Sequence, residues 1–134
     1  MIAPMSSLIT GQVLFEETLP ASGRAHVALF SHATQDPNPI HVDDDFAHRA
    51  GFATVLQQGP MTTAQFARLL QQFGGAHSLR MLDVTFTAPV YPDDSLILRA
   101  QVVQVGDTVR CALTASKLDG TKTATGEAEL SIHR

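Results

Sequence analysis

One segment of the chain carries clear signals for the start and end of a helix and almost no charge. Gly59-Pro60 places a proline at the first helical position, and Gly74-Gly75 ends the segment. Arg68 is its only charged residue. Its large apolar side chains recur at helical spacing: Phe66, Leu69, Leu70 and Phe73. A helix with so little charge has no wide polar face for water, so we predict that it is buried on most of its sides.

Four strand-like runs follow the helix, over residues 79–87, 95–105, 108–118 and 121–132. The last two alternate strictly between apolar and polar side chains, which is typical of a sheet with one buried face. Gly106-Asp107 and Asp119-Gly120 are hairpin-turn signals between successive runs. Together with a first strand at Val13–Leu19, they predict a five-stranded antiparallel sheet that curls around the helix. The expected fold class is α+β.

Two short helices are expected before the long one. Ser22 can cap the first, over residues 23–33, because its hydroxyl can accept a hydrogen bond from a free backbone N–H. The apolar side of this helix is predicted to hold Ala25, Leu29 and Ala33. Asp43 is expected to cap the second helix, which ends near Gly51.

Composition narrows the class of protein. The chain has 134 residues, of which 44% are apolar and 16% charged, with a net charge of −4. This length predicts a single domain, 1–134, and the apolar content argues against disorder. Because the chain is acidic and its basic residues are scattered, we expect no nucleic-acid partner. The shortage of charge predicts that another subunit covers part of the surface.

Cys111 is the only cysteine, so it cannot form an internal disulfide. This is typical of a reducing compartment, and its apolar neighbours predict a buried core residue. Residues 1–10 lack the basic start of a signal peptide. The longest uncharged run, residues 50–67, is too polar to span a bilayer. We therefore expect a cytoplasmic protein without a membrane partner.

The residues suited to proton transfer lie in Asp36-Pro37-Asn38-Pro39-Ile40-His41-Val42-Asp43. On a helix Asp36 and His41 would point roughly 140° apart, and on a strand they would lie on opposite faces. The two prolines restrict the residues before them to extended geometry, so residues 36–40 are predicted to be an irregular, stiff turn. Such a turn can bring the carboxylate and the imidazole to one water as a general acid–base pair. The alternative is a polar surface turn with a solvated His41.

The pattern Asp36-x-Asn38-Pro39-x-His41-x-Asp43, with Ala47 four residues on, resembles the hydratase 2 motif of MaoC-like (R)-specific enoyl-CoA hydratases. The resemblance continues through Phe52 and Gly59 and covers roughly residues 10–132. Its second motif is Phe86-x-Ala88-Pro89-Val90-x-Pro92-x-Asp94-Ser95-Leu96. The resemblance implies the hot-dog fold, in which an antiparallel sheet wraps a central helix, and a homodimer or larger homo-oligomer.

The resemblance also implies roles for four residues. Asp36 and His41 would activate the water that adds to a trans-2-enoyl-CoA or a related acyl-carrier-protein thioester, and Asn38 would help to hold their turn. Gly59 would donate its backbone N–H to the thioester carbonyl. Addition of water builds enolate charge on that oxygen, and N–H groups at a helix N-terminus stabilise such charge. The resemblance implies no cofactor and no metal.

Three departures from the family pattern lie along the long helix. Gln58 stands where members commonly have histidine, and it cannot titrate. Pro60-Met61 stands where many have Met-Leu, and Ala67 replaces a serine found in some members. Because Asp36 and His41 are retained, these departures bear on the identity of the substrate more than on the type of reaction.

Three other functions fit part of the pattern. A hot-dog thioesterase would need a carboxylate on or facing the central helix, and residues 59–73 contain no Asp or Glu. A metal enzyme would combine His41 and Asp43 with His77 or His133, although the two prolines fit the hydratase turn better. A non-catalytic subunit that binds acyl thioesters stays open because of Gln58.

Overall fold

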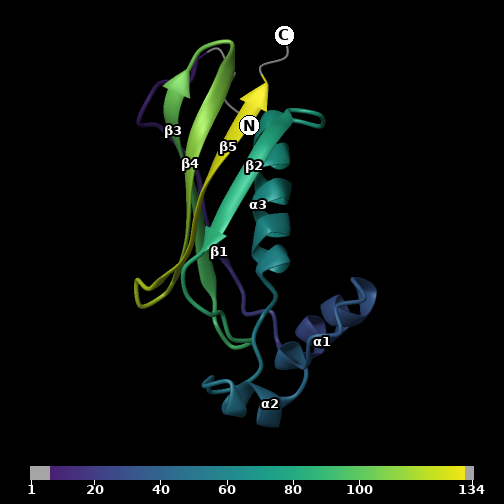
Figure 1. Ribbon diagram of the computed structural model, residues 1–134. Helices are drawn as coiled ribbons and strands as arrows, with labels where there is room; N and C mark the ends of the chain where they lie inside the picture. The colour runs from purple at the N-terminus through teal and green to yellow at the C-terminus, as the bar shows by residue number, and fades with distance from the viewer. Residues whose placement is uncertain (1–6, 132–134) are drawn as a thin grey trace.

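The computed structural model describes residues 7–131 of the chain. Within these residues, five strands form one antiparallel sheet in the order β1-β3-β4-β5-β2. The strands are β1 (Val13–Leu19), β2 (Leu79–Phe86), β3 (Leu96–Val105), β4 (Thr108–Lys117) and β5 (Lys122–Ser131). The long helix α3 (Gly59–Gly74) lies along one face of the sheet (Figure 1). The α+β class is confirmed, and the predicted strands agree with the observed ones to within about two residues.

The core lies between this face of the sheet and α3. Alternate residues of β4 and β5 are buried, as their patterns predict: Val109, Cys111, Leu113, Ala115, Ala124, Ala128 and Leu130. They belong to one apolar cluster with Phe66, Leu69 and Leu70 of α3. Burial in this cluster is the main driving force for folding, at roughly 25 cal/mol per Å² of apolar surface removed from water. The last residue of the predicted final strand, Ile132, lies outside the described residues.

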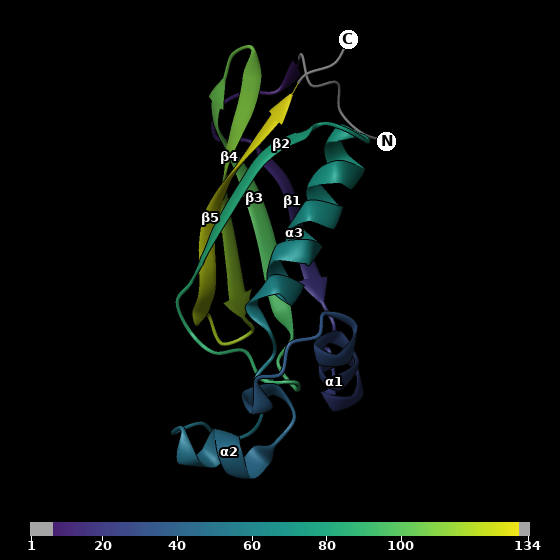
Figure 2. The ribbon, with the colours of Figure 1, turned by 45° about the vertical axis from the view of Figure 1, so that its right-hand side comes forward.

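The long helix is covered on one side only. Its buried side chains are Met61, Thr62, Phe66, Leu69 and Leu70. Ala64 and Arg68 are exposed, and Figure 2 shows the sheet on one side of α3 with no described element across the other. The prediction of burial on most sides is therefore wrong for a single chain, because the sheet bends around α3 without enclosing it.

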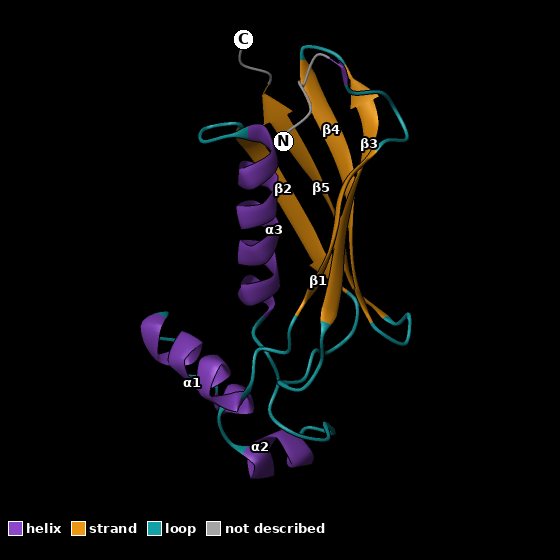
Figure 3. Ribbon diagram, turned by 180° about the vertical axis from the view of Figure 1, so that it is seen from behind, coloured by secondary structure: helices purple, strands orange, loops and turns teal. Residues whose placement is uncertain are grey.

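Two short helices lie beyond the N-terminal end of α3, away from the sheet: α1 (Arg24–Ala33) and α2 (Asp44–Arg49) (Figure 3). Asp43 caps α2 as predicted, since its carboxylate accepts a hydrogen bond from the Phe46 N–H at 3.2 Å. None of the helices in the described residues is long and apolar enough to cross a membrane.

The predictions for α1 need two corrections. Its N-cap is Gly23, with φ at 81°, and the Ser22 hydroxyl is buried without a hydrogen-bond partner. Its buried residues are Val27 and Ser31, whereas Leu29 is 62% exposed. The helix buries the side that carries Val27 and Ser31 and not the predicted apolar stripe, so apolar periodicity identified the wrong face.

The edge strand β2 lies unusually close to its neighbour β5 at Gly126. Gly126 pairs with Val84, and a Cβ atom at this glycine would collide with the backbone carbonyl of Asp83. A backbone group cannot move aside as a side chain can. The position of β2, and of Phe86 at its end, therefore depends on the missing side chain at Gly126.

Candidate active site

The proline-rich turn contains one turn of 3-10 helix, η2 (Pro39–His41). Asn38 caps it, because its side-chain oxygen accepts from the Ile40 N–H at 3.1 Å. The Asp36 carboxylate accepts from the Asn38 N–H at 3.1 Å and fixes the preceding residues. The expectation that residues 36–40 form an irregular turn is therefore wrong from Pro39 onward, where the backbone is helical. Proline is tolerated at a first helical position, where its missing N–H would have no partner.

The turn brings Asp36 and His41 together. The distance from His41 Nε2 to Asp36 Oδ2 is 3.4 Å. The imidazole is largely enclosed, with its side chain 12% exposed, whereas the Asp36 side chain is 36% exposed. The pair therefore has one sheltered member and one that water can reach.

A backbone carbonyl sets the tautomer of His41. The Leu56 oxygen lies 2.8 Å from His41 Nδ1, and since a carbonyl can only accept, Nδ1 carries the proton. In the neutral ring, Nε2 then presents its lone pair toward Asp36. Two acceptors cannot bond to each other, but each can accept one hydrogen of the same water. Such an arrangement can hold a water molecule and accept a proton from it.

Gly59 is the first residue of α3 and lines a cavity of about 380 Å³. The cavity wall is mainly apolar: Phe52, Leu56, Phe86, Ala88, Pro89 and Val90. Within the part of the chain that the structure describes, no group accepts a hydrogen bond from the Gly59 N–H. An N–H in the first turn of a helix has no partner inside the helix, so it is available to an anionic or polarised oxygen.

Asp36 and His41 do not line the Gly59 cavity of the single chain. Asp36 lines another cavity, of about 480 Å³, together with Ser31 and Val42. Leu56 connects the two places. Its carbonyl holds His41, its N–H donates to the Ile40 carbonyl at 3.0 Å, and it lines the Gly59 cavity. The structure thus joins the pair to the Gly59 cavity through one short segment without placing all three in one pocket.

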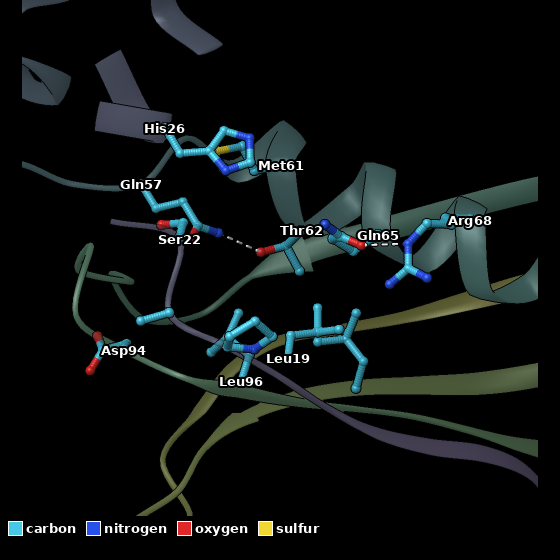
Figure 4. A pocket seen from close by; sticks show the side chains of 13 residues that line it. Leu19, Ser22, His26, Gln57, Met61, Thr62, Gln65, Arg68, Asp94 and Leu96 are labelled. Atoms are coloured by element: carbon cyan, nitrogen blue, oxygen red, sulfur yellow. Dashed lines mark hydrogen bonds between the residues drawn. The ribbon is translucent and has the colours of Figure 1, made fainter. Parts of the chain in front are cut away.

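A third cavity, of about 340 Å³, shares part of its wall with the Gly59 cavity (Figure 4). Gln57 and Thr62 line both cavities, and the Gln57 amide donates to the Thr62 hydroxyl at 3.3 Å. On its far side lie Leu19 and Leu96, at the ends of β1 and β3 that face α3. The Gln57 and Thr62 side chains, joined by this long hydrogen bond, therefore separate the third cavity from the Gly59 cavity.

Gln58 is buried, with 2% of its surface exposed, directly before Gly59. Its Nε2 donates to the Val27 carbonyl at 2.8 Å and to the Ser31 hydroxyl at 2.6 Å, and its Oε1 has no partner. Because the Val27 carbonyl can only accept, the orientation of the amide is fixed. Gln58 thus makes structural hydrogen bonds at a position where the family commonly has histidine.

Neither Leu56 nor Ser31 is predicted from the sequence as a residue of the site. Leu56 acts through its backbone oxygen, which leaves no sequence signal. Ser31 carries a weak one, since it is a polar residue on the buried side of a helix, but that side becomes known only from the structure.

The proposed metal triad does not come together. Asp43 uses its carboxylate to cap α2, and the described residues contain no group of three His, Cys, Asp or Glu side chains that would hold a metal ion. His133 lies outside the described residues.

Comparison with known proteins places this geometry in context. The model of the MaoC like domain family matches residues 5–128. The (R)-specific enoyl-CoA hydratase of Aeromonas caviae is 28% identical over 115 residues, which cover 82% of this chain and 86% of that protein. A mitochondrial 3-hydroxyacyl-[acyl-carrier-protein] dehydratase of Arabidopsis thaliana is 28% identical over 108 residues, covering 80% of this chain and 63% of that protein.

Solved structures of hydratases superpose closely on this chain. The (R)-hydratase of A. caviae involved in PHA biosynthesis superposes with a TM-score of 0.85 at 25% identity, covering 95% of this chain and 98% of that one. R-hydratase PhaJ1 from Pseudomonas aeruginosa gives the same score and identity, over 96% of this chain and 84% of that one. The expected hot-dog fold is confirmed.

Proposed function

The chain belongs to the MaoC-like domain family, and we propose that it catalyses the reversible hydration of a trans-2-enoyl thioester to the (R)-3-hydroxyacyl thioester. Similarity to a hydratase that acts on CoA esters and to a dehydratase that acts on acyl-carrier-protein esters supports a hydro-lyase of this kind. The proposal depends above all on one observation, the 3.4 Å approach of Asp36 Oδ2 and His41 Nε2 with Nδ1 held by Leu56.

Water is the nucleophile in the proposed reaction. Asp36 and His41 each accept one of its hydrogens, so that an oxygen lone pair points at C3 of the enoyl group. As the new C3–O bond forms, one water proton passes to the pair, and the C2–C3 π electrons move to make an enolate. A proton from the pair then adds to C2. A positioned acid or base of this kind contributes typically about 10²–10⁴-fold to the rate.

The enolate oxygen needs a donor, and Gly59 is the residue proposed to supply it. Its N–H has no protein acceptor among the described residues, and it lies at the positive end of a 16-residue helix. The cavity around it is mainly apolar, which strengthens a hydrogen bond to a developing negative charge. Asn38, by capping η2, holds the turn that carries His41.

Two alternatives are less well supported. A thioesterase would need a carboxylate on or facing the central helix, and residues 59–73 contain no Asp or Glu. A binding subunit would have no use for the matched acceptors of Asp36 and His41. We also propose that the protein acts as a homodimer or larger homo-oligomer, because α3 is covered on one side only in the single chain.

The deciding experiment is a turnover assay with trans-2-enoyl-CoA esters of increasing chain length. Loss of the conjugated thioester absorbance, with an (R)-3-hydroxyacyl product by chiral chromatography, is the expected result. Release of free thiol instead would identify a thioesterase. Tight binding of the esters without turnover would identify a binding subunit, and either outcome overturns the proposal.

A further inference from the structure

A single buried amide joins the two helices that border the candidate site. Gln58, the residue before Gly59, hydrogen-bonds to Val27 and Ser31 of α1. We propose that Gln58 is a positioning residue that fixes Asp36 relative to the amino end of α3. The expected effect of Gln58 on turnover rests on the proposed function. Its effect on the position of Asp36 rests on the structure alone.

The buried side of α1 is hydrogen-bonded to Gln58. Val27 and Ser31 are the buried residues of this helix, and they are the same two residues that accept hydrogen bonds from the Gln58 amide. The rest of α1 is largely exposed, and the helix lies beyond the end of the sheet (Figure 3). Besides the hydrogen bond from the Gly23 N–H to the Pro92 carbonyl and the exposed ion pair between Arg24 and Asp44, the Gln58 amide supplies the buried polar contacts of this helix.

From Ser31 the connection continues to Asp36. The Ser31 carbonyl accepts a hydrogen bond from the Asp36 N–H at 2.9 Å, just after the end of α1. On the other side of the pair, the Leu56 carbonyl holds His41 at 2.8 Å. Both members of the pair are thus fastened to residues 56–58, which lead directly into Gly59. Asp36 is held through Gln58 and Ser31, and His41 through Leu56.

The chemistry of an amide explains why glutamine suits this position. Its Nε2 carries two hydrogens, and one nitrogen therefore serves two acceptors. A histidine ring has at most one hydrogen on each nitrogen. One ring nitrogen could therefore donate to the Val27 carbonyl or to the Ser31 hydroxyl, but not to both. A glutamate would offer none when ionised, and its charge would face the Val27 carbonyl oxygen.

The test combines Gln58→Met, which keeps the length of the side chain without its donors, with Ser31→Ala, which removes one acceptor. Amide hydrogen exchange at Asp36 should become at least about 10-fold faster in both, since its partner Ser31 is no longer held. In the assay on enoyl-CoA, kcat should fall by about 10- to 100-fold while KM changes little, because misplacement of Asp36 affects the chemical step. Gln58→His should give intermediate values for both.

Ser78→Ala is the matched control. Ser78 is buried near the opposite end of α3, and its hydroxyl donates to the Gly75 carbonyl at 2.7 Å. The same substitution there should cost similar stability and leave both kcat and exchange at Asp36 unchanged. Equal loss of kcat in Ser31→Ala and Ser78→Ala would mean general destabilisation and would overturn the inference.

Gln58→Glu adds a readout that packing alone does not predict. Burial raises the pKa of a carboxyl group, and only the protonated acid can donate to Val27 or Ser31. The kcat of this variant, relative to wild type, should therefore rise as pH falls. Unchanged exchange at Asp36 in Gln58→Met overturns the inference whether or not the protein turns over. Absence of wild-type turnover on every thioester, with exchange altered as expected, overturns only the proposed function.

Discussion

The ring of Phe86 lies against Gly59, so closely that a Cβ atom on this glycine would be 2.7 Å from the ring Cε2. Phe86 ends β2, and Gly59 begins α3, so one contact joins the edge of the sheet to the proposed thioester-binding N–H. Phe86 is 49% exposed although it is a large apolar residue, and it lines the Gly59 cavity. Its ring forms a wall of the cavity that a change at Gly59 would displace.

Gly59→Ala should therefore fold but work poorly. The ring of Phe86 is free enough to move aside, so the melting temperature should change little, whereas kcat/KM should fall by about 10-fold or more as the cavity reshapes. Gly74→Ala is the matched control at the other end of α3, where the added Cβ would meet the Ser78 hydroxyl at 2.6 Å. That variant should lose stability and keep its kcat. Wild-type kcat/KM in Gly59→Ala would contradict the role of the Phe86 ring as a wall of the substrate cavity, because the substitution retains the backbone N–H.

Asp36→Asn and His41→Gln should each lower kcat by about 10²–10⁴-fold, because each removes one of the two basic acceptors for the water. The double variant should be little worse than either single one, since the two residues act as a unit. Hydration and dehydration rates should fall by the same factor. Both are measured at the enoyl-thioester absorbance, with circular dichroism to verify folding. A loss below tenfold in both folded single variants would contradict the assignment of Asp36 and His41 as the acid–base pair.

Cys111→Ser should reduce stability without affecting chemistry. Cys111 is fully buried in the core, and a hydroxyl without a partner there should cost about 1–3 kcal/mol of unfolding free energy. Chemical denaturation measures the cost, and kcat per folded molecule should equal that of the wild type. If the variant folds normally and loses all turnover, the assignment of Cys111 to the core alone is wrong.

The burial of the Cys111 thiol should also make the protein less stable at high pH. Burial raises the pKa of the Cys111 thiol to about 11 from its ordinary value of 9.0. Between these values the unfolded chain releases this proton and the folded chain keeps it, so stability should fall as pH rises through this window. Cys111→Ala should lack this component. At neutral pH, thiol reagents should label Cys111 of the wild type only as fast as the fold opens to expose it.

The ion pair between Arg24 and Asp44 should make the contact between α1 and α2 sensitive to acid. Hydrogen bonds from the Arg24 guanidinium, at 2.7 Å, and from the Val55 N–H lower the pKa of Asp44 below its usual value. Its contribution is therefore present above the ordinary carboxyl pKa and is lost as pH falls through the lowered one. Asp44→Asn should be less stable than wild type at neutral pH, and the difference, measured by chemical denaturation, should vanish once the pH falls below the lowered pKa of Asp44.

Association of two or more chains is expected at micromolar concentration. One side of α3 is open in the single chain, and only 16% of the residues are charged. Light scattering should give at least twice the chain mass of 14.4 kDa. A monomer that retains full turnover would contradict this prediction.

The sheet could be predicted because its signal is local. Alternation along β4 and β5 reports directly which side chains are buried, and the hairpin turns fix their order. The extended part of the proline-rich turn, up to Asn38, could also be predicted, since Pro37 and Pro39 restrict the residues before them independently of the rest of the fold. In both cases the physical constraint lies within the residues that show it.

The placement of α1 could not be predicted in the same way. Its buried side is chosen by a hydrogen bond to Gln58, 31 positions from Val27, and its Leu29 stripe faces water. The carbonyl of Leu56 is likewise invisible in a sequence, because every residue has one. Interactions between distant segments, and those made by the backbone, are what sequence patterns do not encode.

The close approach of β2 and β5 at Gly126 has a consequence for how variants of this protein would be read. A side chain at Gly126 would push β2 away, and with it Phe86, the residue that borders Gly59. A mutational scan scored by turnover would thus group Gly126 with the residues of the cavity, although it lies inside the sheet. The residues whose substitution lowers turnover would therefore include some that do not contact the substrate.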